Sequence, residues 1–405
     1  MSMPGSQTAD RPRPPVATMS QAEVQAALAR AVATVRATIP AFREVYPDDT
    51  TVGGRYLPRS ARDGFPQGAN VGWTTGFVPG MQWIAAEIGD DPVFTAAALE
   101  HLDNFEQRAR AHQDLDHHDL GFLYHLAAVT AWRQVQQRGG REAGLLAAEA
   151  LMTRFVEPAG VFQAWGSLQD PQQSGRTIVD SLMNMPLLVW ASQTTGEPRY
   201  REAALRHINQ LATHMVRDDG STYHTFTWDA VTGVPLHGNT AQGAGDGSCW
   251  ARGQAWAIYG FALAYRIFGL REFRVLAERC AEVFWVRLPP DLVPYWDLDF
   301  GAGSGEPRDS SAGAIAVCGL LELASTAGDP ASAELARNRA GRLLAALVRD
   351  CAPAAEQSDA LLLHGVYSKP GNAGVDEGNL WGDYFYLEAL ARTADPGWEP
   401  IWCAD

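Results

Sequence analysis

The feature that most constrains this chain is an alternation between two kinds of helical segment. Apolar residues recur at helical spacing in twelve stretches, at 20–38, 75–88, 91–110, 119–137, 142–156, 177–195, 198–216, 250–268, 271–287, 310–326, 330–349 and 379–393. The odd-numbered stretches have Ala and Leu on one face and Arg, Glu and Gln on the other, which is typical of helices with one face in water. The even-numbered stretches are apolar nearly all round, which indicates burial.

Six buried and six half-exposed helices in alternation predict a double ring, an all-α (α/α)6 barrel with six inner and six outer helices. Because such a ring has one core, we expect residues 20–405 to form a single catalytic domain, although the length alone suggests two or three domains. Residues 1–19 are rich in Pro and small polar residues and are predicted to be a disordered tail. Strand-like alternation is scarce and occurs at Tyr223–Trp228 and at Leu361–Tyr367.

The connections between helices predict where function lies. Short Gly/Asp/Pro turns such as IGDDP and TTGEPR follow the inner helices, whereas long loops lead into them, at 157–176, 217–249, 287–309 and 350–378. Long loops on a rigid scaffold commonly carry function, so we expect a functional mouth where the inner helices begin. Six helix N-termini give such a mouth a positive dipole potential that favours an anion.

The charge balance excludes several functions. The chain has 32 basic and 47 acidic residues, a formal net charge of −15 and 46% hydrophobic residues. Without a basic run, binding to nucleic acid or to anionic lipid is not expected. No apolar run reaches the roughly 20 residues that span a bilayer, and no signal peptide is visible. Five scattered cysteines without CxxC spacing favour reduced thiols and a cytoplasmic location.

Two aspartates at the predicted mouth are candidate catalytic residues. Asp180 is embedded in the apolar stretch TIVDSLMNMPLLVW, where loss of hydration raises the pKa of a carboxyl group and makes it a usable general acid. Asp119 begins another inner helix, directly after two histidines. Each aspartate is alternatively a plain cap of its helix. Two carboxylates in different surroundings can divide into a proton donor and an ionised partner, and thirteen tryptophans suit a cleft that stacks on sugar rings.

Other polar residues at the helix starts have both a functional and a structural interpretation. His117 and His118 are metal ligands together with Asp119 in one alternative, but adjacent histidines rarely face one ion and no zinc motif is present, so we expect no metal. His224 lies in a strand-like segment and is either structural or functional. Arg252 either holds a substrate carboxylate through a bidentate pair or forms a salt bridge with a local Asp.

Six ordered motifs resemble those of one enzyme family. They are HHDLGFLY, TIVDSLMNMPLLVWAS, YHTFTWDAVTG, SCWARGQAWAIYGFALAYR, DSSAGAIAVCGLLELA and HGVYSKPGNAGVDEGNLWGDYFYLEAL. They look like the motifs of the unsaturated glucuronyl hydrolases, glycoside hydrolase family 88, over nearly the whole chain. The resemblance implies an (α/α)6 barrel, in agreement with the helix pattern. It also implies removal of 4,5-unsaturated glucuronic acid from the non-reducing end of oligosaccharides that polysaccharide lyases leave.

The resemblance assigns roles to individual residues. The Asp of VDSLMN, Asp180, is implied to be the catalytic acid/base, and the Asp of HHDLGF, Asp119, the second catalytic carboxylate. The substrate-lining positions of the family match Trp73, His118, Trp165, His224, Gln242, Trp250, Arg252 and Trp256. The implied reaction needs neither a metal ion nor an organic cofactor.

One loop departs from the family pattern. Members that prefer sulfated substrates have a Ser-x-x-Ser-x-Lys pattern after HGVY, whereas the loop here reads SKPGNA. Ser368 keeps the first Ser, but Gly371 and Ala373 stand at the second Ser and at the Lys. Tight recognition of a 6-sulfate is therefore not expected. We include Tyr367, Ser368 and Lys369, the only lysine of the chain, among the predicted substrate contacts.

Three other functions stay open on the sequence. An unsaturated rhamnogalacturonyl hydrolase on the same barrel would act on pectin-derived disaccharides. A non-catalytic glycan-binding barrel would bind without loss of the double bond, and an isomerase or epimerase of free sugars would use His118 and His224 as acid and base. For the favoured hydrolase, the expected partner is an unsaturated uronyl oligosaccharide, and the chain is expected to be a monomer or weak homodimer.

Overall fold

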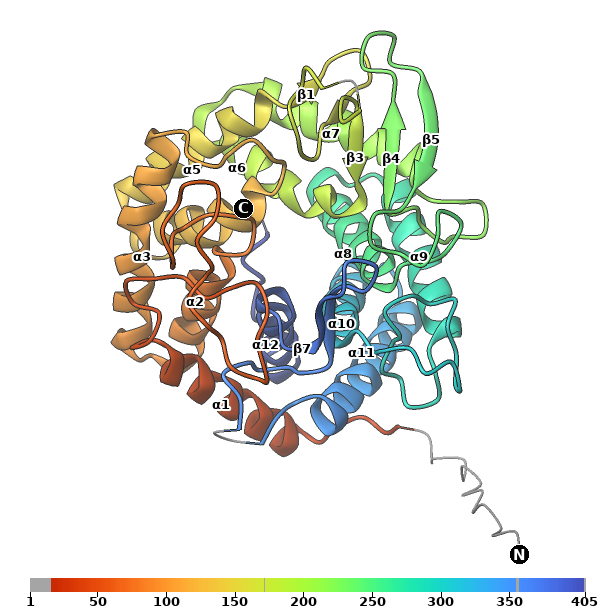
Figure 1. The fold of residues 1–405 in the computed structure, drawn as a ribbon. Helices are drawn as coiled ribbons and strands as arrows, with labels where there is room; N and C mark the ends of the chain where they lie inside the picture. Colours follow the sequence, from red (N-terminus) through yellow and green to blue (C-terminus); the bar gives the residue numbers. More distant parts are fainter. Residues whose placement is uncertain (1–15, 171, 355–356, 404–405) are drawn as a thin grey trace, which may run out of the picture.

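The computed structural model describes residues 16–170, 172–354 and 357–403, so most of the predicted tail lies outside the described residues. Helices in this part of the chain form two concentric rings (Figure 1). The outer ring contains α1 (Gln21–Thr38), α3 (Pro92–Arg110), α5 (Arg138–Met152), α7 (Pro198–His214), α9 (Arg271–Arg287) and α11 (Pro330–Asp350). The inner ring contains α2 (Phe77–Gly89), η1 (Gly121–Val129) continued by α4 (Thr130–Val135), η2 (Val179–Asn184) continued by α6 (Met185–Thr195), α8 (Ala251–Phe268), α10 (Ser310–Ser325) and α12 (Leu380–Ala394). The predicted (α/α)6 barrel is confirmed.

The inner ring closes through helices from the two ends of the chain. Each inner helix packs against its inner neighbours, and α12 packs against α2. The first outer helix, α1, lies against α12, as the red and dark blue ribbons of Figure 1 show. The inner helices are buried nearly all round, with Phe77, Leu123 and Phe385 at 0% exposure. The apolar periphery of the even-numbered stretches is thus covered on every side, as their sequence predicts.

Capping residues set the ends of several helices. Ser20 and Glu23 form a reciprocal capping box at the start of α1, and the side chain of Asp91 caps α3. Gly196 and Gly269 adopt the left-handed conformation and end α6 and α8. The short turns that the sequence predicts after the inner helices therefore have identifiable backbone causes.

Two inner helices begin with irregular turns that the helical pattern does not predict. The first, η1, is a π-helix, and the second, η2, is a 3-10 helix. They approach each other so closely that a Cβ on Gly121 would collide with Asn184. The side-chain Oδ1 of Asn184 accepts the N–H of Phe122 at 3.0 Å. Rare π turns are frequent at functional sites, and here both irregular turns adjoin the candidate aspartates.

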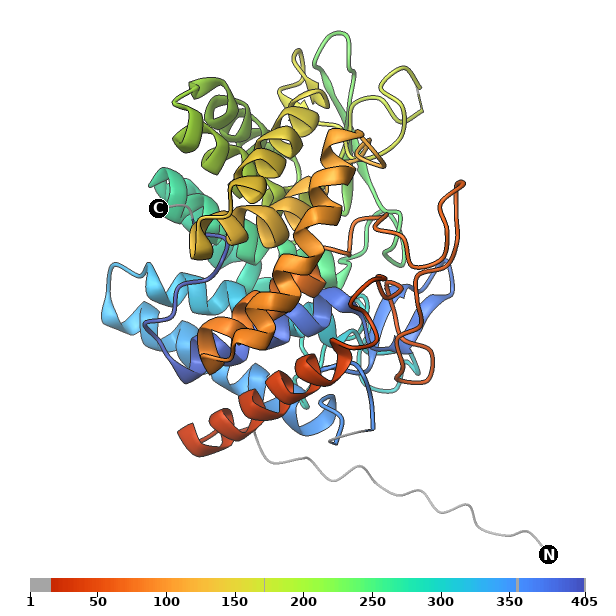
Figure 2. The same cartoon turned by 90° about the vertical axis from the view of Figure 1, so that its left-hand side faces the viewer.

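Small β-sheets lie where the long loops enter the inner helices. They are the hairpin β1 (Phe155–Val156) and β2 (Val161–Phe162), the sheet of β3 (Arg176–Ile178), β4 (Thr225–Trp228) and β5 (Pro235–Asn239), and the hairpin β6 (Gly365–Ser368) and β7 (Ala373–Glu377). All neighbouring strands are antiparallel. Both strand-like segments of the sequence contain a strand, β4 and β6. Figure 2 shows the long loops and hairpins on one side of the barrel and the C-terminal segment on the other.

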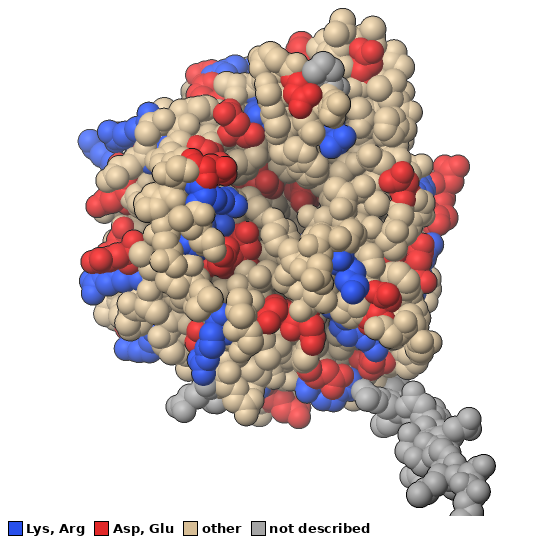
Figure 3. Space-filling view, viewed as in Figure 1, with Lys and Arg blue, Asp and Glu red and all other residues tan. Residues whose placement is uncertain are grey.

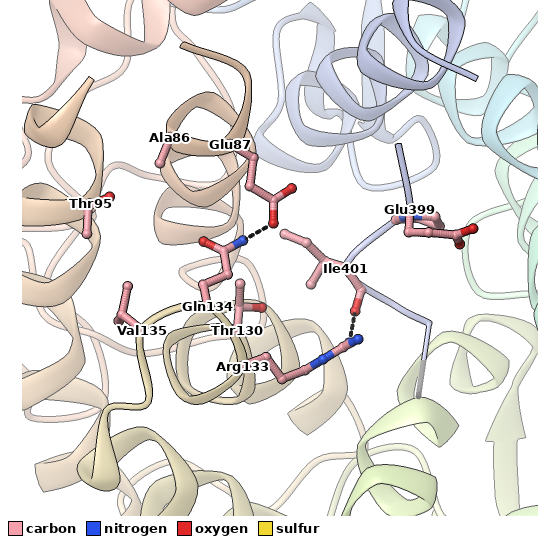
Figure 4. A pocket seen from close by; sticks show the side chains of 10 residues that line it. Ala86, Glu87, Thr95, Thr130, Arg133, Gln134, Val135, Glu399 and Ile401 are labelled. Carbon is pink, nitrogen blue, oxygen red and sulfur yellow. Dashed lines mark hydrogen bonds between the residues drawn. The ribbon is translucent and has the colours of Figure 1, made fainter. Parts of the chain in front are cut away.

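The C-terminal segment covers the far end of the barrel. Trp402 is fully buried, its ring packs against Phe122 and Phe385, and its Nε1 donates to Glu388 at 2.9 Å. A pocket of about 560 Å³ lies beside this segment, lined by residues such as Glu87 and Arg133 (Figure 4). None of its lining residues belongs to the predicted site. Among the described helices, none combines the length and apolarity needed to cross a membrane.

Candidate active site

Asp119 and Asp180 both lie close to one nitrogen of the His118 imidazole. Nε2 of His118 is 3.3 Å from Oδ1 of Asp119 and 3.5 Å from Oδ1 of Asp180. The His118 side chain is only 1% exposed, whereas each Asp side chain is 16% exposed. Figure 3 shows acidic atoms deep in a hollow at the centre of the ring. Both Asp side chains are therefore partly open to solvent, whereas the imidazole that contacts them is sealed from it.

The two aspartates have opposite pKa shifts. Burial raises the pKa of Asp180 well above its ordinary value, and the charge of Asp119 raises it further, against the opposing effect of Arg252. Burial also opposes ionisation of Asp119, but the neighbouring His118 and His117 outweigh it and lower the pKa of Asp119. A protonated and an ionised carboxyl group side by side form the arrangement of a proton donor with an anionic partner.

His118 completes a three-residue group that the sequence does not predict as a unit. Ligand atoms of His118, Asp119 and Asp180 lie within 4.8 Å of one another, a spacing compatible with a metal ion. His117 is not part of this group, because its Nδ1 accepts the backbone N–H of Asp119 at 3.1 Å. The alternative in which both histidines and Asp119 hold one ion therefore does not match the geometry. Burial lowers the pKa of His118 to about 4, so its imidazole is neutral at neutral pH.

Arg252 forms the local salt bridge that the sequence left open. Its Nη1 lies 2.9 Å from Oδ2 of Asp309, and both side chains are buried. Its Nη2 donates to the carbonyl of Tyr367 at 2.8 Å and to Oε1 of Gln242 at 2.6 Å. The guanidinium group also lies 4.5 Å from the ring centre of Trp250. Arg252 thus fixes surrounding loops, and its donors are already engaged within the protein.

His224 is likewise held by the chain around it. Its Nδ1 accepts the N–H groups of Ala241 at 2.9 Å and Gln242 at 3.2 Å. Its ring centre is 4.2 Å from that of Trp250. Burial lowers its pKa to about 3, and Arg252 and His118 act in the same direction. A neutral imidazole that orders the loop before Gln242 accounts for these contacts.

Trp73 and Tyr367 meet at the mouth from opposite ends of the sequence. Nε1 of Trp73 donates to the hydroxyl of Tyr367 at 3.2 Å, and the Trp73 ring stacks on Trp381 with centroids 5.1 Å apart. Ser368 is the last residue of β6, and its Oγ accepts the N–H of Gly371 in the turn that follows, at 3.2 Å. Lys369 follows in the same turn and is half-buried. Tyr367 therefore belongs to the aromatic cluster, and Ser368 and Lys369 lie at its border.

The two remaining tryptophans of the predicted site have different surroundings. Trp165 is half-buried, and its Nε1 donates to Oε1 of Gln173 at 2.9 Å. The carbonyl of the preceding Ala164 accepts the N–H of His118 at 2.8 Å, which ties this loop to the group of His118, Asp119 and Asp180. Trp256 is only 1% exposed and packs between Phe122 and Phe385. In this structure Trp256 is a core residue and presents no open face.

Three residues of this cluster were not predicted as site residues. Asp309 pairs with Arg252, Asn184 joins the two irregular turns, and Trp381 stacks on Trp73 while its Nε1 donates to Oγ of Ser311 at 2.9 Å. Each lies at the start of an inner helix, in the motifs RDSS, VDSLMN and NLWGD. Their shared position at helix starts could have marked them in the sequence as candidate residues of the mouth. It does not reveal which partner each residue contacts.

Comparison with known proteins agrees with this geometry. Residues 55–273 match the family model described as Glycosyl Hydrolase Family 88. An unsaturated chondroitin disaccharide hydrolase from Streptococcus pyogenes serotype M1 is 42% identical over 386 residues, covering 95% of this chain and 94% of its own. An unsaturated glucuronyl hydrolase from Bacillus sp. (strain GL1) is 40% identical over 325 residues, covering 80% and 86%. The crystal structure of unsaturated glucuronyl hydrolase from Streptococcus agalactiae has a TM-score of 0.89 at 40% identity, covering 95% of each chain.

The chain therefore belongs to glycoside hydrolase family 88. It is an enzyme of the glycoside hydrolase class, and the expectation drawn from its six motifs is confirmed at that level.

Proposed function

We propose that this chain releases 4,5-unsaturated glucuronic acid from the non-reducing end of lyase-generated oligosaccharides. The observation that carries the proposal is the pair Asp180 and Asp119, two partly exposed carboxyl groups with opposite pKa shifts at the hollow of a family 88 barrel. The relatives from Streptococcus pyogenes and Bacillus sp. carry names that describe hydrolysis of unsaturated saccharides, which supports the same substrate class.

The chemistry of the substrate explains why one protonated carboxyl group suffices. The C4=C5 bond of the unsaturated sugar is a vinyl ether, so a proton from Asp180 adds to C4 and the ring oxygen stabilises the resulting cation at C5. Water then adds to C5 and gives its proton back to Asp180. The hemiketal product opens and expels the remaining saccharide. This order differs from that of ordinary glycosidases, whose carboxylates act at the anomeric carbon.

The neighbours of Asp180 have supporting roles in this proposal. Ionised Asp119 stabilises the positive charge that develops on the sugar and keeps Asp180 protonated by raising its pKa. Neutral His118 presents its Nε2 to both carboxyl groups and can donate or accept one hydrogen bond there. Trp73, Trp165 and Tyr367, which are only partly buried, offer aromatic faces to the sugars. No step of this sequence requires a metal ion or an organic cofactor.

The other functions receive less support from the geometry. An isomerase or epimerase with His118 and His224 as acid and base would need an imidazolium donor, but burial lowers the pKa values of these residues to about 4 and about 3. A non-catalytic glycan-binding barrel has no use for a carboxyl group with a raised pKa. An unsaturated rhamnogalacturonyl hydrolase would use the same carboxyl pair, and a trial with pectin-derived disaccharides distinguishes it.

The cellular setting is part of the proposal as well. All five cysteines are free and buried, which is compatible with a reducing compartment such as the cytoplasm. Closure of the inner ring by α2 and α12 supports one domain over residues 20–405. We keep the expectation of a monomer or weak homodimer without nucleic acid or membrane partners.

The test is loss of the ultraviolet absorbance of the C4=C5 bond when the enzyme is incubated with an unsulfated, lyase-made disaccharide. We expect Asp180→Asn to lower kcat by roughly 10²- to 10⁴-fold. Asp376→Asn is the matched control, because Asp376 is an exposed acid of the hairpin β6–β7 and its positive φ suits Asn. Full activity of Asp180→Asn would refute the assigned role. Binding of unsaturated disaccharides without any loss of absorbance would favour the glycan-binding barrel.

A further inference from the structure

Arg59 is a buried cation with unused hydrogen-bond donors. It lies in the loop between α1 and α2 and is 1% exposed. Its Nη2 donates to Oδ1 of Asp49 at 2.9 Å and also to Oγ1 of Thr74. Its Nε and Nη1 are buried and have no partner among the described residues. A buried charged group with unsatisfied donors is costly, so this position suits an additional acceptor.

A second guanidinium group converges on the same place. A Cβ built on Gly72 would lie 2.8 Å from Nη1 of Arg59 and closer still to Nη2 of Arg62. The unpartnered side of Arg59 and the tip of Arg62 thus lie over the same α-carbon. Gly72 has a φ of +80° and no side chain, so both guanidinium groups can approach its α-carbon to distances at which a Cβ would collide with them. Arg62 is exposed and reaches this place from the surface.

No carboxylate in the described part of the chain neutralises this pair of nitrogens. Asp49 is engaged with the opposite nitrogen of Arg59, and Arg62 forms no ion pair with a described residue. Asp114, the nearby acid, accepts the N–H of Gly72 at 2.5 Å and pairs with Arg108 at 3.3 Å. Two cations that face each other without a bridging anion repel, and an oxyanion between them removes that repulsion.

This place adjoins the candidate active site. Gly72 immediately precedes Trp73, whose ring packs against Phe122 with centroids 5.6 Å apart. Phe122 follows Asp119 by three residues. Figure 3 shows a group of basic atoms on the rim of the central hollow, over the N-terminal loops drawn in orange in Figure 1. An anion held by Arg59 and Arg62 is therefore next to the aromatic cluster that would hold the sugars.

We propose that Arg59 and Arg62 bind an oxyanion, a sulfate or carboxylate, carried by the sugar that the reaction releases. This inference rests on the proposed function for the identity of the substrate, but the anion site itself stands on the geometry. The carboxylate of the unsaturated sugar is attached to C5, the carbon that reacts at Asp180, so an anion beside Gly72 belongs to the following sugar. The site supplies positive charge through a different loop from the SKPGNA turn, which lacks the Ser and Lys of sulfate-preferring relatives.

The first experiment measures binding without catalysis. The full chain is titrated calorimetrically with inorganic sulfate at low ionic strength. We expect saturable binding by the wild type and at least about tenfold weaker binding by Arg62→Ala, since a charge-assisted hydrogen bond is lost. Arg43→Ala is the matched control: Arg43 is an exposed arginine of the same loop and pairs with Glu100, so its removal changes the net charge equally. Absence of binding by the wild type, or equal binding by Arg62→Ala, overturns the site.

The second experiment identifies the source of the anion. Two unsaturated disaccharides that differ only by a sulfate on the released sugar are compared in the absorbance assay. We expect Arg62→Ala to raise KM for the sulfated substrate several-fold, with unchanged kcat, and to leave the unsulfated one alone. If sulfate binds but neither KM changes, the site takes a free anion and its assignment to the substrate is wrong. If the wild type cleaves no unsaturated disaccharide, the proposed function fails while the titration still decides the anion site.

Discussion

Arg252 and Asp309 form a buried ion pair, 2.9 Å apart, between two inner helices and the hairpin β6–β7. Arg252 belongs to α8, Asp309 caps α10, and the guanidinium group also donates to the carbonyls of Val366 and Tyr367 in β6. The mouth of the barrel is thus organised around one charge that never reaches solvent. The partners of Arg252 come from three separate parts of the chain, so this ion pair can form only when those parts have come together at the mouth.

Removal of one partner of this pair should destabilise the fold. Asp309→Asn leaves the Arg252 charge buried without its counter-ion, and we expect a loss of about 3 to 5 kcal/mol in the free energy of unfolding, measured by urea denaturation. The double variant Arg252→Met with Asp309→Asn should lose less than the sum of the two single changes, because the unpaired charge is gone. Strictly additive losses would show that the two side chains are not coupled.

The alkaline limb of the pH–rate profile should depend on Asp119. In the proposed mechanism, activity needs protonated Asp180 and falls as the pH rises through its pKa, which burial and the charge of Asp119 both raise. Asp119→Asn removes that charge, so the residual kcat/KM should decline at lower pH than in the wild type. Asp116→Asn, a change at an exposed acid of the same loop, serves as control and should leave the limb in place. An unmoved or alkaline-shifted limb in Asp119→Asn would contradict the electrostatic coupling.

The single lysine should affect charged substrates only. Lys369 lies in the turn of the hairpin, next to Ser368 and beyond Tyr367. Lys369→Ala should raise KM for oligosaccharides whose released part is charged and leave neutral ones unchanged, as steady-state kinetics at low ionic strength can measure. The same rise in KM for neutral substrates would instead indicate that the turn supports the shape of the mouth.

The C-terminal tryptophan should stabilise the barrel from its far end. Trp402 is fully buried against Phe122 and Phe385 and donates to Glu388. Trp402→Ala should cost about 3 to 5 kcal/mol of unfolding free energy in a denaturant titration. Trp285→Ala is the matched control, because Trp285 is only partly buried on the outer helix α9, and its loss should cost clearly less. If both variants lost the same unfolding free energy, Trp402 would stabilise the barrel no more than a partly buried tryptophan of the outer ring.

The local sequence pattern predicts this fold well because inner and outer helices differ in which of their faces are apolar. The apolar periphery of SSAGAIAVCGLLELAS identifies α10 as inner, and the Asp329 cap and charged face of α11 identify it as outer. The π-helix η1 and the 3-10 helix η2 escaped prediction because their geometry depends on the contact of Gly121 with Asn184. Nothing within either segment alone specifies that contact.

The site was predicted in its residue types but not in its pairings. An Asp within an apolar helical stretch is unusual, so Asp180 could be selected from the sequence as a candidate catalytic residue. The partner of Arg252 was not, because Asp309 lies 57 residues away and is brought close only when the inner helices α8 and α10 pack against each other. The unpartnered donors of Arg59 could not be predicted from the sequence either. That a donor lacks a partner can be seen only when the positions of all its described neighbours are known.

Closure of the ring by α12 against α2 bears on how the protein is made. The ribosome emits α2 before α12, so the inner ring stays open until α12 has been made. Trp73 cannot meet Tyr367 and Trp381 before then. Until then the flank of α2 that packs against α12 stays uncovered, and exposed apolar surface of this kind makes an incomplete chain prone to aggregation. The aromatic side of the mouth therefore assembles only after α12 has been made, later than the contacts among His118, Asp119 and Asp180 become possible.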